Sequence, residues 1–296
     1  MRVTVLGASG VIGRALVAEL ASRHEVVAVS RRARPRADGV TWVVADATRA
    51  ETLDVALSGS EIAFYLVHSL GAREFERVDR LAAANVARAA ERNGLRQIVY
   101  LGGLGDDDPD LSPHLRSRHE TAVALASGSV PVTTLRAAMV VGRDSAAFET
   151  ILALVDRLPA MVCPRWVSTP TQPIALEDAV AYLAAVAGLE QALGATFDIG
   201  GPEVMSYREM IERIGALRGR RPRIVEVPVL TPRLSSWWLH LVTPVRASVA
   251  RPLIEGLRNP TVVRDERIRE LVPLPLTGFD EAVRRALARD HGRERG

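Results

Sequence analysis

Three glycines near the start of the chain have the spacing to hold the phosphates of a nucleotide. They stand in Gly7-Ala8-Ser9-Gly10-Val11-Ile12-Gly13, directly after an apolar run at residues 3–6 and at the start of a helical stretch. A glycine-rich turn permits close approach, and the backbone N–H groups and positive dipole of a helix start suit a pyrophosphate. We therefore predict a dinucleotide-binding site that includes Gly7, Ser9, Gly10, Val11, Ile12 and Gly13.

The end of the second predicted strand carries the side chains that would choose between the two nicotinamide dinucleotides. It reads Ser30-Arg31-Arg32, without an acid to bond the ribose hydroxyls. Two guanidinium groups can donate charge-assisted hydrogen bonds to a 2′-phosphate instead. We expect a preference for NADP(H), with NAD(H) as the second choice; the alternative is a solvated arginine pair.

Further cofactor contacts are expected where other predicted strands end. The carboxylate of Asp46 is placed to meet the adenine, and its other role would be to cap the helix that follows, as Thr48 could also do. We expect Asp46, Ala47, Val67 and Gly102 to contact the cofactor.

Two tyrosines and a histidine also lie near strand ends. Tyr65 and His68 lie at the end of the fourth predicted strand, and Tyr100 near the end of the fifth. Open α/β sheets bind ligands at the carboxyl ends of their strands. Alternation along a strand favours a buried Tyr65, whereas His68 lies beyond the strand end and is the better candidate to face a ligand.

Composition limits the chemistry. All 38 basic side chains other than histidine are arginines, so Schiff-base catalysis and lysine-tuned acids are excluded. Cys163 is the single cysteine, which excludes an intrachain disulfide and favours a buried thiol. No metal site is predicted, because no set of ligands has metal spacing. Nucleic-acid binding is not expected, since acids and bases are interspersed and the basic stretches are short.

The elements that must position these residues alternate along the first half of the chain. Short β-branched runs are separated by alanine-rich stretches, the pattern of βαβ units around a parallel sheet. We predict strands at 3–6, 25–30, 41–44, 62–67, 97–101 and 133–140, and helices at 13–23 and 79–93. The predicted fold class is α/β, a doubly wound parallel-sheet Rossmann fold.

The pattern changes after residue 150, where prolines mark loops. We predict a helix at 176–187, a strand at 197–201 and a helix at 206–217, capped by Ser206 with Glu209 three residues on. Residues 1–150 are interpreted as the Rossmann domain and 151–296 as a smaller, discontinuous substrate-binding lobe. A segment around residues 170–190 is expected to return to the Rossmann core.

Residues 234–242 are apolar and aromatic and include Trp237 and Trp238. They fall far short of the roughly 20 residues of a bilayer span. Packing within the lobe, a subunit contact and a peripheral membrane contact all stay open for them. The N-terminal apolar run is too short for a signal peptide, so we expect a cytoplasmic protein.

Further motifs resemble the short-chain dehydrogenase/reductase superfamily, in its atypical and extended branch, over nearly the whole chain. The landmarks are the glycine motif, Asp46-Ala47, Asn85, the run 135–142 and Phe197-Asp198-Ile199-Gly200-Gly201. More narrowly, the runs 65–69, 100–105 and 112–120 are similar to bacterial NAD(P)H-binding proteins. That group is related to a complex I accessory subunit and to nitrogen-repression regulators.

The superfamily's catalytic residues are only partly matched. Active members have a serine at the end of the fifth strand and a Tyr-x-x-x-Lys after it, where this chain has Gly102-Gly103 and then His114 and Arg118. The resemblance implies that Arg118 could bond the nicotinamide ribose, and His114 could donate a proton, because an unperturbed histidine has a pKa of about 6.5. The alternative for His114 is a surface position in the loop after Pro113. His114, Arg118 and His68 are the candidate catalytic residues.

Two functions fit these residues. The first is an NADP(H)-dependent reductase of a small carbonyl, quinone or enal, with His114, His68 or water as the proton donor. By analogy with extended members, Arg165, Trp166 and Gln172 would line its cleft. The second is a non-catalytic NADP(H)-binding sensor, regulator or assembly factor. Loss of the serine, tyrosine and lysine favours the second function, whereas a second lobe favours a small-molecule substrate.

Overall fold

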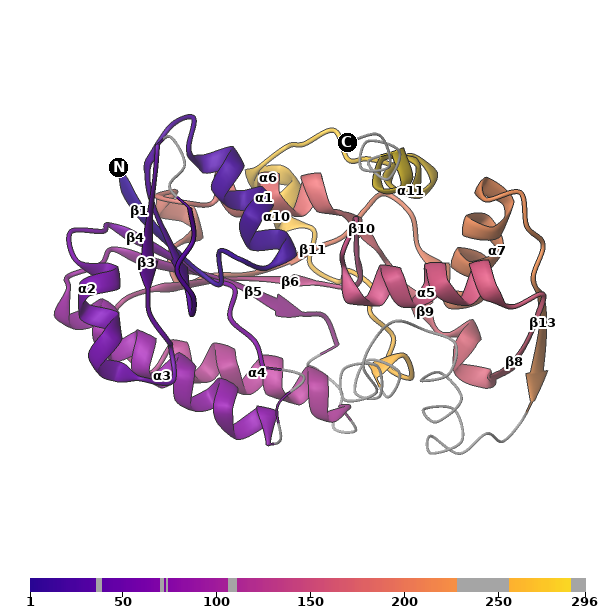
Figure 1. Cartoon of the computed structure of the whole chain (residues 1–296), viewed down its shortest axis with the longest axis horizontal. Helices are drawn as coiled ribbons and strands as arrows, with labels where there is room; N and C mark the ends of the chain where they lie inside the picture. Colours follow the sequence, from indigo (N-terminus) through magenta and orange to yellow (C-terminus); the bar gives the residue numbers. More distant parts are fainter. Residues whose placement is uncertain (36–38, 70–71, 73, 106–110, 228–255, 289–296) are drawn as a thin grey trace.

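The computed structural model of the chain describes residues 1–35, 39–69, 72, 74–105, 111–227 and 256–288. Its centre is a parallel seven-stranded sheet of order β11-β6-β5-β4-β1-β2-β3 (Figure 1). The strands are β1 (Arg2–Leu6), β2 (Glu25–Ser30), β3 (Val40–Val44), β4 (Ile62–Tyr65), β5 (Gln97–Gly103), β6 (Val132–Ala137) and β11 (Thr196–Ile199). This architecture confirms the predicted α/β Rossmann fold.

Helices cover both faces of the sheet. One face packs against α1 (Val11–Leu20) and α6 (Leu176–Ala185), and the other against α2 (Leu53–Leu57), α3 (Phe75–Arg92) and α4 (Pro113–Leu125). Neighbouring strand residues therefore enter opposite cores: Val26 and Ala28 pack beside α1, whereas Val27 and Val29 pack on the α3 side. Burial on both faces explains why these strands are apolar throughout.

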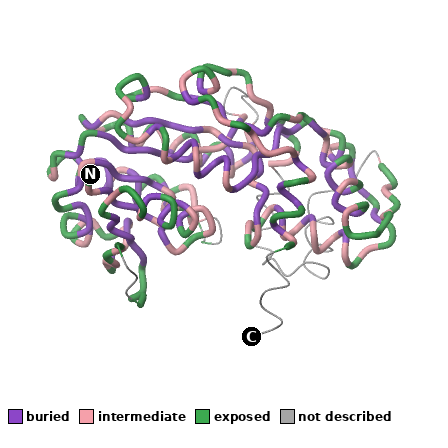
Figure 2. The backbone as a smooth tube through the Cα atoms, turned by 90° about the horizontal axis from the view of Figure 1, so that it is seen from above, coloured by how far each residue is buried: buried purple, intermediate pink, exposed green. Residues whose placement is uncertain are grey.

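A second lobe lies at the end of the molecule away from β2 and β3 (Figure 1). Its elements are α5 (Ala146–Arg157), β8 (Ala160–Pro164), α7 (Tyr207–Leu217), β13 (Arg223–Val227) and α11 (Phe279–Ala288), and they share one apolar cluster. Ser206 caps α7 as predicted: its hydroxyl accepts from the N–H of Glu209 at 3.2 Å, and the Glu209 carboxylate accepts from the N–H of Ser206 at 2.6 Å. Buried backbone runs through both parts, and exposed backbone lies on the outer turns (Figure 2).

Short pairings join the two parts. Strand β7 (Val140–Val141) pairs with β10 (Ile174–Ala175), and β9 (Pro170–Thr171) pairs with β12 (Met205–Ser206). The chain then returns to the sheet as α6 and β11, and α10 (Arg267–Leu271) adds Ile268 to the core beside α1. The Rossmann core is therefore completed by residues from the second half of the chain.

The structure corrects several predicted boundaries. The strand expected at 133–140 breaks at Ala138 and Met139, because β5 ends at Gly103 and Val140 then pairs with Ile174. The strand expected at 62–67 ends at Tyr65, and the helix expected at 79–93 already begins at Phe75.

The buried positions expected for Tyr65 and Cys163 are confirmed. Residues 234–242, with Trp237 and Trp238, lie outside the described residues. In the part of the chain that the structure describes, no helix combines the length and the apolar character that a membrane crossing requires.

Candidate functional site

The glycine motif forms the turn between β1 and α1. Gly7 has a φ of +86°, in the left-handed region, and a Cβ there would lie 2.8 Å from the carbonyl oxygen of Leu66. A Cβ on Gly13 would lie 2.3 Å from the carbonyl oxygen of Gly7, so these two glycines let α1 start close against the strand.

The same turn leaves room for a ligand at the start of α1. Gly10 is exposed, and the first turn of α1 holds no acidic residue. The first N–H groups of a helix have no acceptor within the helix, and they carry the positive end of its dipole. The guanidinium of Arg14 holds the turn from outside by donating to the carbonyl of Ser9 and to Asp144, each at 3.0 Å. This cradle fits the pyrophosphate of a dinucleotide.

The end of β2 presents two cations to solvent. Arg31 and Arg32 are exposed, while Ser30 is buried and its hydroxyl donates to the carbonyl of Arg32. Both guanidinium groups therefore lie at the carboxyl edge of the sheet, where the adenosine end of a dinucleotide is expected.

Asp46 does not cap the helix that follows, which was its alternative role, because neither the turn Ala50–Thr52 nor α2 has a side-chain hydrogen bond at its N-cap. Its Oδ1 accepts from the N–H of Thr48 at 2.9 Å and from the Thr48 hydroxyl at 2.8 Å. Burial opposes ionisation, but these bonds, with the charges of Arg31 and Arg49, outweigh it and lower the pKa of Asp46. The next residue, Ala47, is held by Asn85, whose amide donates to its carbonyl at 3.0 Å. A contact of Asp46 and Ala47 with adenine stays a prediction.

The three candidate catalytic residues gather at the carboxyl edge of the sheet, and we call them the basic cluster: His68, His114 and Arg118. His68 follows the end of β4, and it is an exposed side chain. His114 lies in the first turn of α4, one turn before Arg118. The loop expected around His114 is therefore wrong: Pro113 starts a helix there, and Ser112 caps it by accepting from the N–H of Leu115.

Electrostatics link the members of the basic cluster. Desolvation by the surrounding protein, followed by the charge of Arg118, lowers the pKa of His68 to about 4 although its imidazole keeps exposed surface. Desolvation, Arg118 and His68 together lower the pKa of His114 to about 3. Both imidazoles are therefore neutral at pH 7, and Arg118 is the charged member of the cluster.

Glycines replace the superfamily's serine beside the cluster and change the packing there. A Cβ on Gly103 would lie 3.1 Å from a methyl carbon of Leu115 and 3.6 Å from Cγ of Arg118. The glycine lets α4 approach β5, and the Tyr100 hydroxyl donates to the carbonyl of Arg118 at 3.1 Å. Gly102 and Gly103 also line a shallow pocket between α4 and the edge formed by β6 and β11.

The three residues expected to line the cleft from the second lobe differ in their surroundings. The amide of Gln172 donates to the carbonyl of Gly201 at 2.8 Å and accepts from the N–H of Val263 at 3.0 Å. Trp166 packs against the apolar cluster of the lobe, and Arg165 is exposed. Of these three, Gln172 joins the segment after β11 to the segment at Val263.

Sequence reasoning missed a buried group next to the cluster. The carboxylate of Asp79 in α3 accepts hydrogen bonds from Ser69, which follows His68 in the chain, and from Ser117, which precedes Arg118. The predicted helix included Asp79, but its partners lie in other elements and no local spacing indicates them. The one available signal is a carboxylate on the helix face that must be buried.

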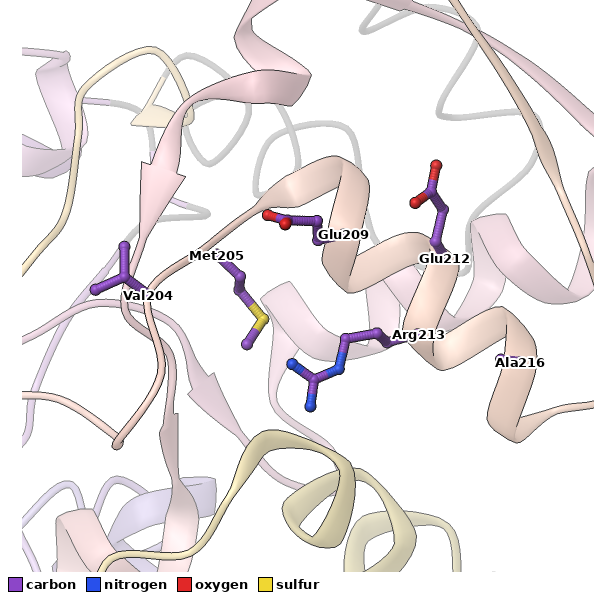
Figure 3. A pocket seen from close by; sticks show the side chains of 6 residues that line it. All are labelled: Val204, Met205, Glu209, Glu212, Arg213 and Ala216. Carbon is purple, nitrogen blue, oxygen red and sulfur yellow. The ribbon is translucent and has the colours of Figure 1, made fainter.

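Another surface pocket lies on α7, in the second lobe (Figure 3). Arg213 extends from α7 beside Met205, and its guanidinium is engaged by Glu203 at 2.6 Å and Asp280 at 2.8 Å. These ion pairs tie α7 to α11, so this pocket is a surface feature of the lobe, away from the basic cluster.

A family model of NAD(P)H-binding proteins matches residues 7–151. Among curated relatives, divinyl chlorophyllide a 8-vinyl-reductase of Oryza sativa subsp. indica is 29% identical over 82% of this chain, which spans 65% of that protein. Subunit 9 of the NADH dehydrogenase 1 alpha subcomplex of Arabidopsis thaliana is 23% identical, over 93% of this chain and 75% of that protein. A (4-alkanoyl-5-oxo-2,5-dihydrofuran-3-yl)methyl phosphate reductase of Streptomyces griseus is 26% identical, over 77% of each chain.

Solved structures show the same fold. Citrobacter sp. triphenylmethane reductase in complex with NADP(H) superimposes with a TM-score of 0.76 at 17% identity, over 97% of this chain and 100% of that one. An NADPH-dependent quinone oxidoreductase of Escherichia coli, in complex with NADPH, has a TM-score of 0.76 at 20% identity, over 96% and 99%. The predicted resemblance to the atypical short-chain dehydrogenases/reductases is confirmed by these likenesses, and residues 7–151 match a family of NAD(P)H-binding proteins.

Proposed function

We propose that the chain is an NADP(H)-dependent reductase of a small conjugated acceptor, a quinone or an enal, or of a small carbonyl. The observation that carries the proposal is the basic cluster, which lies at the same sheet edge as the glycine cradle of α1. Bound NADP(H) would supply the hydride. The chain itself supplies the cradle, one permanent cation and two neutral imidazoles.

The preference for NADP(H) rests on Arg31 and Arg32. Both are exposed at the end of β2, and Ser30 is the residue before them, so no carboxylate stands at this tip. Asp46 is the nearby acid, and Thr48 already occupies its Oδ1. A 2′-phosphate would meet two forked donors here, whereas ribose hydroxyls alone would gain little from them.

The charge state of the cluster favours acceptors that need no strong acid. Arg118 can stabilise negative charge that develops on an acceptor oxygen. His68 and His114, with pKa values of about 4 and 3, cannot serve as imidazolium acids at pH 7. A hydroquinone anion or an enolate is a far weaker base than an alkoxide, so it can take its proton later from water. Quinones and enals are therefore better acceptors for this site than simple ketones.

The names of relatives support a reductase of this kind. A vinyl reductase, a dihydrofuranyl methyl phosphate reductase and a quinone oxidoreductase are among the similar proteins. Each is a reductase by name; this chain shares its fold with the quinone oxidoreductase, and its residues 7–151 match a family of NAD(P)H-binding proteins.

The second candidate function is a non-catalytic NADP(H)-binding sensor or assembly factor. The observation that favours it is the absence of the superfamily's serine, tyrosine and lysine at Gly103, His114 and Arg118. A photosystem II assembly factor of Synechocystis is also similar, at 23% identity over 79% of this chain.

The experiment that separates the two functions is a titration of the purified protein with NADPH and NADH, followed by nicotinamide fluorescence. Quinones and enals are then added to the NADPH complex. We expect tighter binding of NADPH and its oxidation by at least one acceptor. Tight binding without oxidation across the panel would favour the sensor.

A matched pair of variants tests the role of the cluster. Arg118→Met keeps the aliphatic stem and removes the charge, and we expect the turnover number to fall on the order of 100-fold. Arg116→Met is the control, because Arg116 is exposed on the same helix and donates to the carbonyl of Leu111. Equal losses in the two variants would contradict a role for Arg118 in the reaction.

A further inference from the structure

A buried carboxylate on α3 contacts both segments that carry the basic cluster. Asp79 lies in the second turn of α3 and is 4% exposed. Its Oδ1 accepts from the backbone N–H of Ser69 at 2.8 Å and from the Ser69 hydroxyl at 2.6 Å. Its Oδ2 accepts from the hydroxyl of Ser117 at 3.3 Å. One side chain thus joins the loop after β4 to α4.

The two serines are the chain neighbours of the cluster. Ser69 follows His68, so the N–H that Asp79 holds belongs to the planar peptide unit that includes the α-carbon and carbonyl of His68. Ser117 precedes Arg118 on α4, where its hydroxyl is buried against α3. The carboxylate therefore fixes the backbone that carries His68 and the helix that carries Arg118.

Two buried tyrosines have pKa values that both charged groups influence. Tyr65 and Tyr100 are fully buried, with ring centres 5.9 Å apart. After desolvation, the Asp79 carboxylate raises the pKa of Tyr65, whereas the Arg118 guanidinium lowers it. The same two charges act with the same opposite signs on the pKa of Tyr100. Asp79 and Arg118 are thus within electrostatic reach of the same pair of rings.

A carboxylate is a costly way to join two helices. Burying an ionised group is unfavourable unless hydrogen bonds replace its water, and an apolar pair of similar volume often stabilises as well or better. No ion pair of Asp79 occurs among the described residues, and the serines provide the donors instead. Beyond packing, the carboxylate fixes the positions of three donors: the N–H and hydroxyl of Ser69 and the hydroxyl of Ser117.

We propose that Asp79 is a positioning residue for the basic cluster, holding His68 and Arg118 in one arrangement through Ser69 and Ser117. The inference rests on the proposed reductase function, because the geometry it fixes matters only if the cluster meets an acceptor. It adds to that function a residue that touches neither cofactor nor substrate.

The test compares Asp79→Asn with a matched control, Asp178→Asn. Asp178 is also buried, at 8% exposure, and it accepts from the N–H of Thr277 at 2.7 Å and from the Thr277 hydroxyl at 3.0 Å. The Asp178→Asn substitution therefore removes a comparable buried charge, at a loop that does not carry the basic cluster. Ser117→Ala removes only the link to α4.

The expected result separates positioning from stability. In Asp79→Asn the turnover number for a quinone or enal falls on the order of 10- to 100-fold. The NADPH dissociation constant changes by no more than about twofold, since Asp79 bonds Ser69 and Ser117 and no residue of the glycine turn. Asp178→Asn leaves the turnover number of the folded protein unchanged. Asp79→Asn combined with Ser117→Ala is no slower than Asp79→Asn alone, because both act on one link.

An NMR measurement on the intact protein keeps the inference testable without turnover. The imidazole resonances of His68 are expected to shift in Asp79→Asn and to stay in place in Asp178→Asn. If none of the acceptors is reduced by NADPH in the presence of the wild-type protein, the proposed function fails. The shift of the His68 resonances still tests whether Asp79 positions His68. Equal turnover losses in both variants, or an unmoved His68 resonance in Asp79→Asn, would overturn the assignment of Asp79.

Discussion

We expect Arg31 and Arg32, at the end of β2, to decide the choice between NADPH and NADH. Replacing both Arg31 and Arg32 with alanine should weaken NADPH binding on the order of 10- to 100-fold, because two charge-assisted hydrogen bonds to the 2′-phosphate are lost. NADH binding should change much less. Fluorescence titration with both dinucleotides measures the two affinities.

The control for this pair is Arg49→Ala. Arg49 is also exposed near this edge, but its Nε donates to Glu51 at 3.0 Å. Its loss should leave the ratio of the two affinities unchanged. Equal weakening of NADPH and NADH in the Arg31 and Arg32 double variant would show that the 2′-phosphate lies elsewhere.

His114 makes the stability of the protein depend on acid pH. Its pKa is about 3 in the folded chain, against about 6.5 when unfolded, so the unfolded state binds a proton that the folded state does not. The free energy of unfolding should therefore fall as the pH drops below about 6.5.

His114→Gln removes the share of this dependence that His114 contributes and leaves the share of His68, whose pKa is lowered to about 4. The slope of unfolding free energy against pH between pH 6 and pH 4 should decrease by at most about 1.4 kcal/mol per pH unit, the value for one proton. Urea denaturation at several pH values measures the slope. Parallel curves for the variant and the wild type would mean that His114 is hydrated as in the unfolded chain.

At the scale of elements, two glycines at the start of α1 have different roles: Gly13 is required for packing, and Gly10 leaves room for the ligand. Gly13→Ala should prevent stable folding, because its Cβ would stand 2.3 Å from the carbonyl oxygen of Gly7. Gly10→Asp should fold, since Gly10 has a φ of −71° and its Cβ would lie 3.3 Å from the same atom. It should nevertheless lose NADPH binding, because the carboxylate would repel the pyrophosphate.

Thermal unfolding and NADPH titration of both variants check these expectations. Gly10→Ala serves as the control that adds a Cβ without charge. A folded Gly10→Asp protein with wild-type affinity would refute the placement of the pyrophosphate at this turn.

The sequence predicts best the central strands, whose residues form nearly unbroken apolar runs. Strands β1, β2 and β5 are buried on both faces, and their β-branched runs mark them with boundaries accurate to about two residues. Helix α4 is harder, because polar side chains such as His114, Arg116 and Glu120 occupy most of its surface. The loop predicted there is wrong although Ser112 followed by Pro113 is a helix-start signal.

The candidate site could be predicted only where it follows from sheet geometry. The rule that ligands bind at the carboxyl edge leads to His68 and to the glycine turn. It does not lead to Asp79, which meets Ser69 and Ser117 across sequence separations of 10 and 38 residues. The lowered pKa of His114 likewise depends on desolvation by several elements, which no local pattern contains.

At the scale of the whole molecule, residues near the C-terminus bind both parts together. The side chain of Asn259 accepts from the N–H of Ser112 at 3.2 Å, before α4. The hydroxyl of Thr261 lies 2.7 Å from that of Thr171 in the second lobe. Asp198 of β11 then accepts from the N–H of Arg264 at 3.0 Å. The segment from 259 to 264 thus contacts α4, the lobe and the sheet in turn.

This connectivity predicts that residues 1–150 do not fold by themselves. The fragment lacks β11, which pairs with β6, and α6, which covers α1 together with Ile268 and Val272. Leu16, Val17 and Leu20 of α1 would lose the apolar partners that bury them, and unmatched apolar surface of this kind leads to aggregation. We expect the fragment to show no cooperative thermal transition and no NADPH binding, whereas the full chain unfolds in one transition that NADPH shifts upward. A soluble fragment that unfolds cooperatively and binds NADPH would show instead that the first half of the chain is an autonomous domain, and that α6 and β11 only extend it.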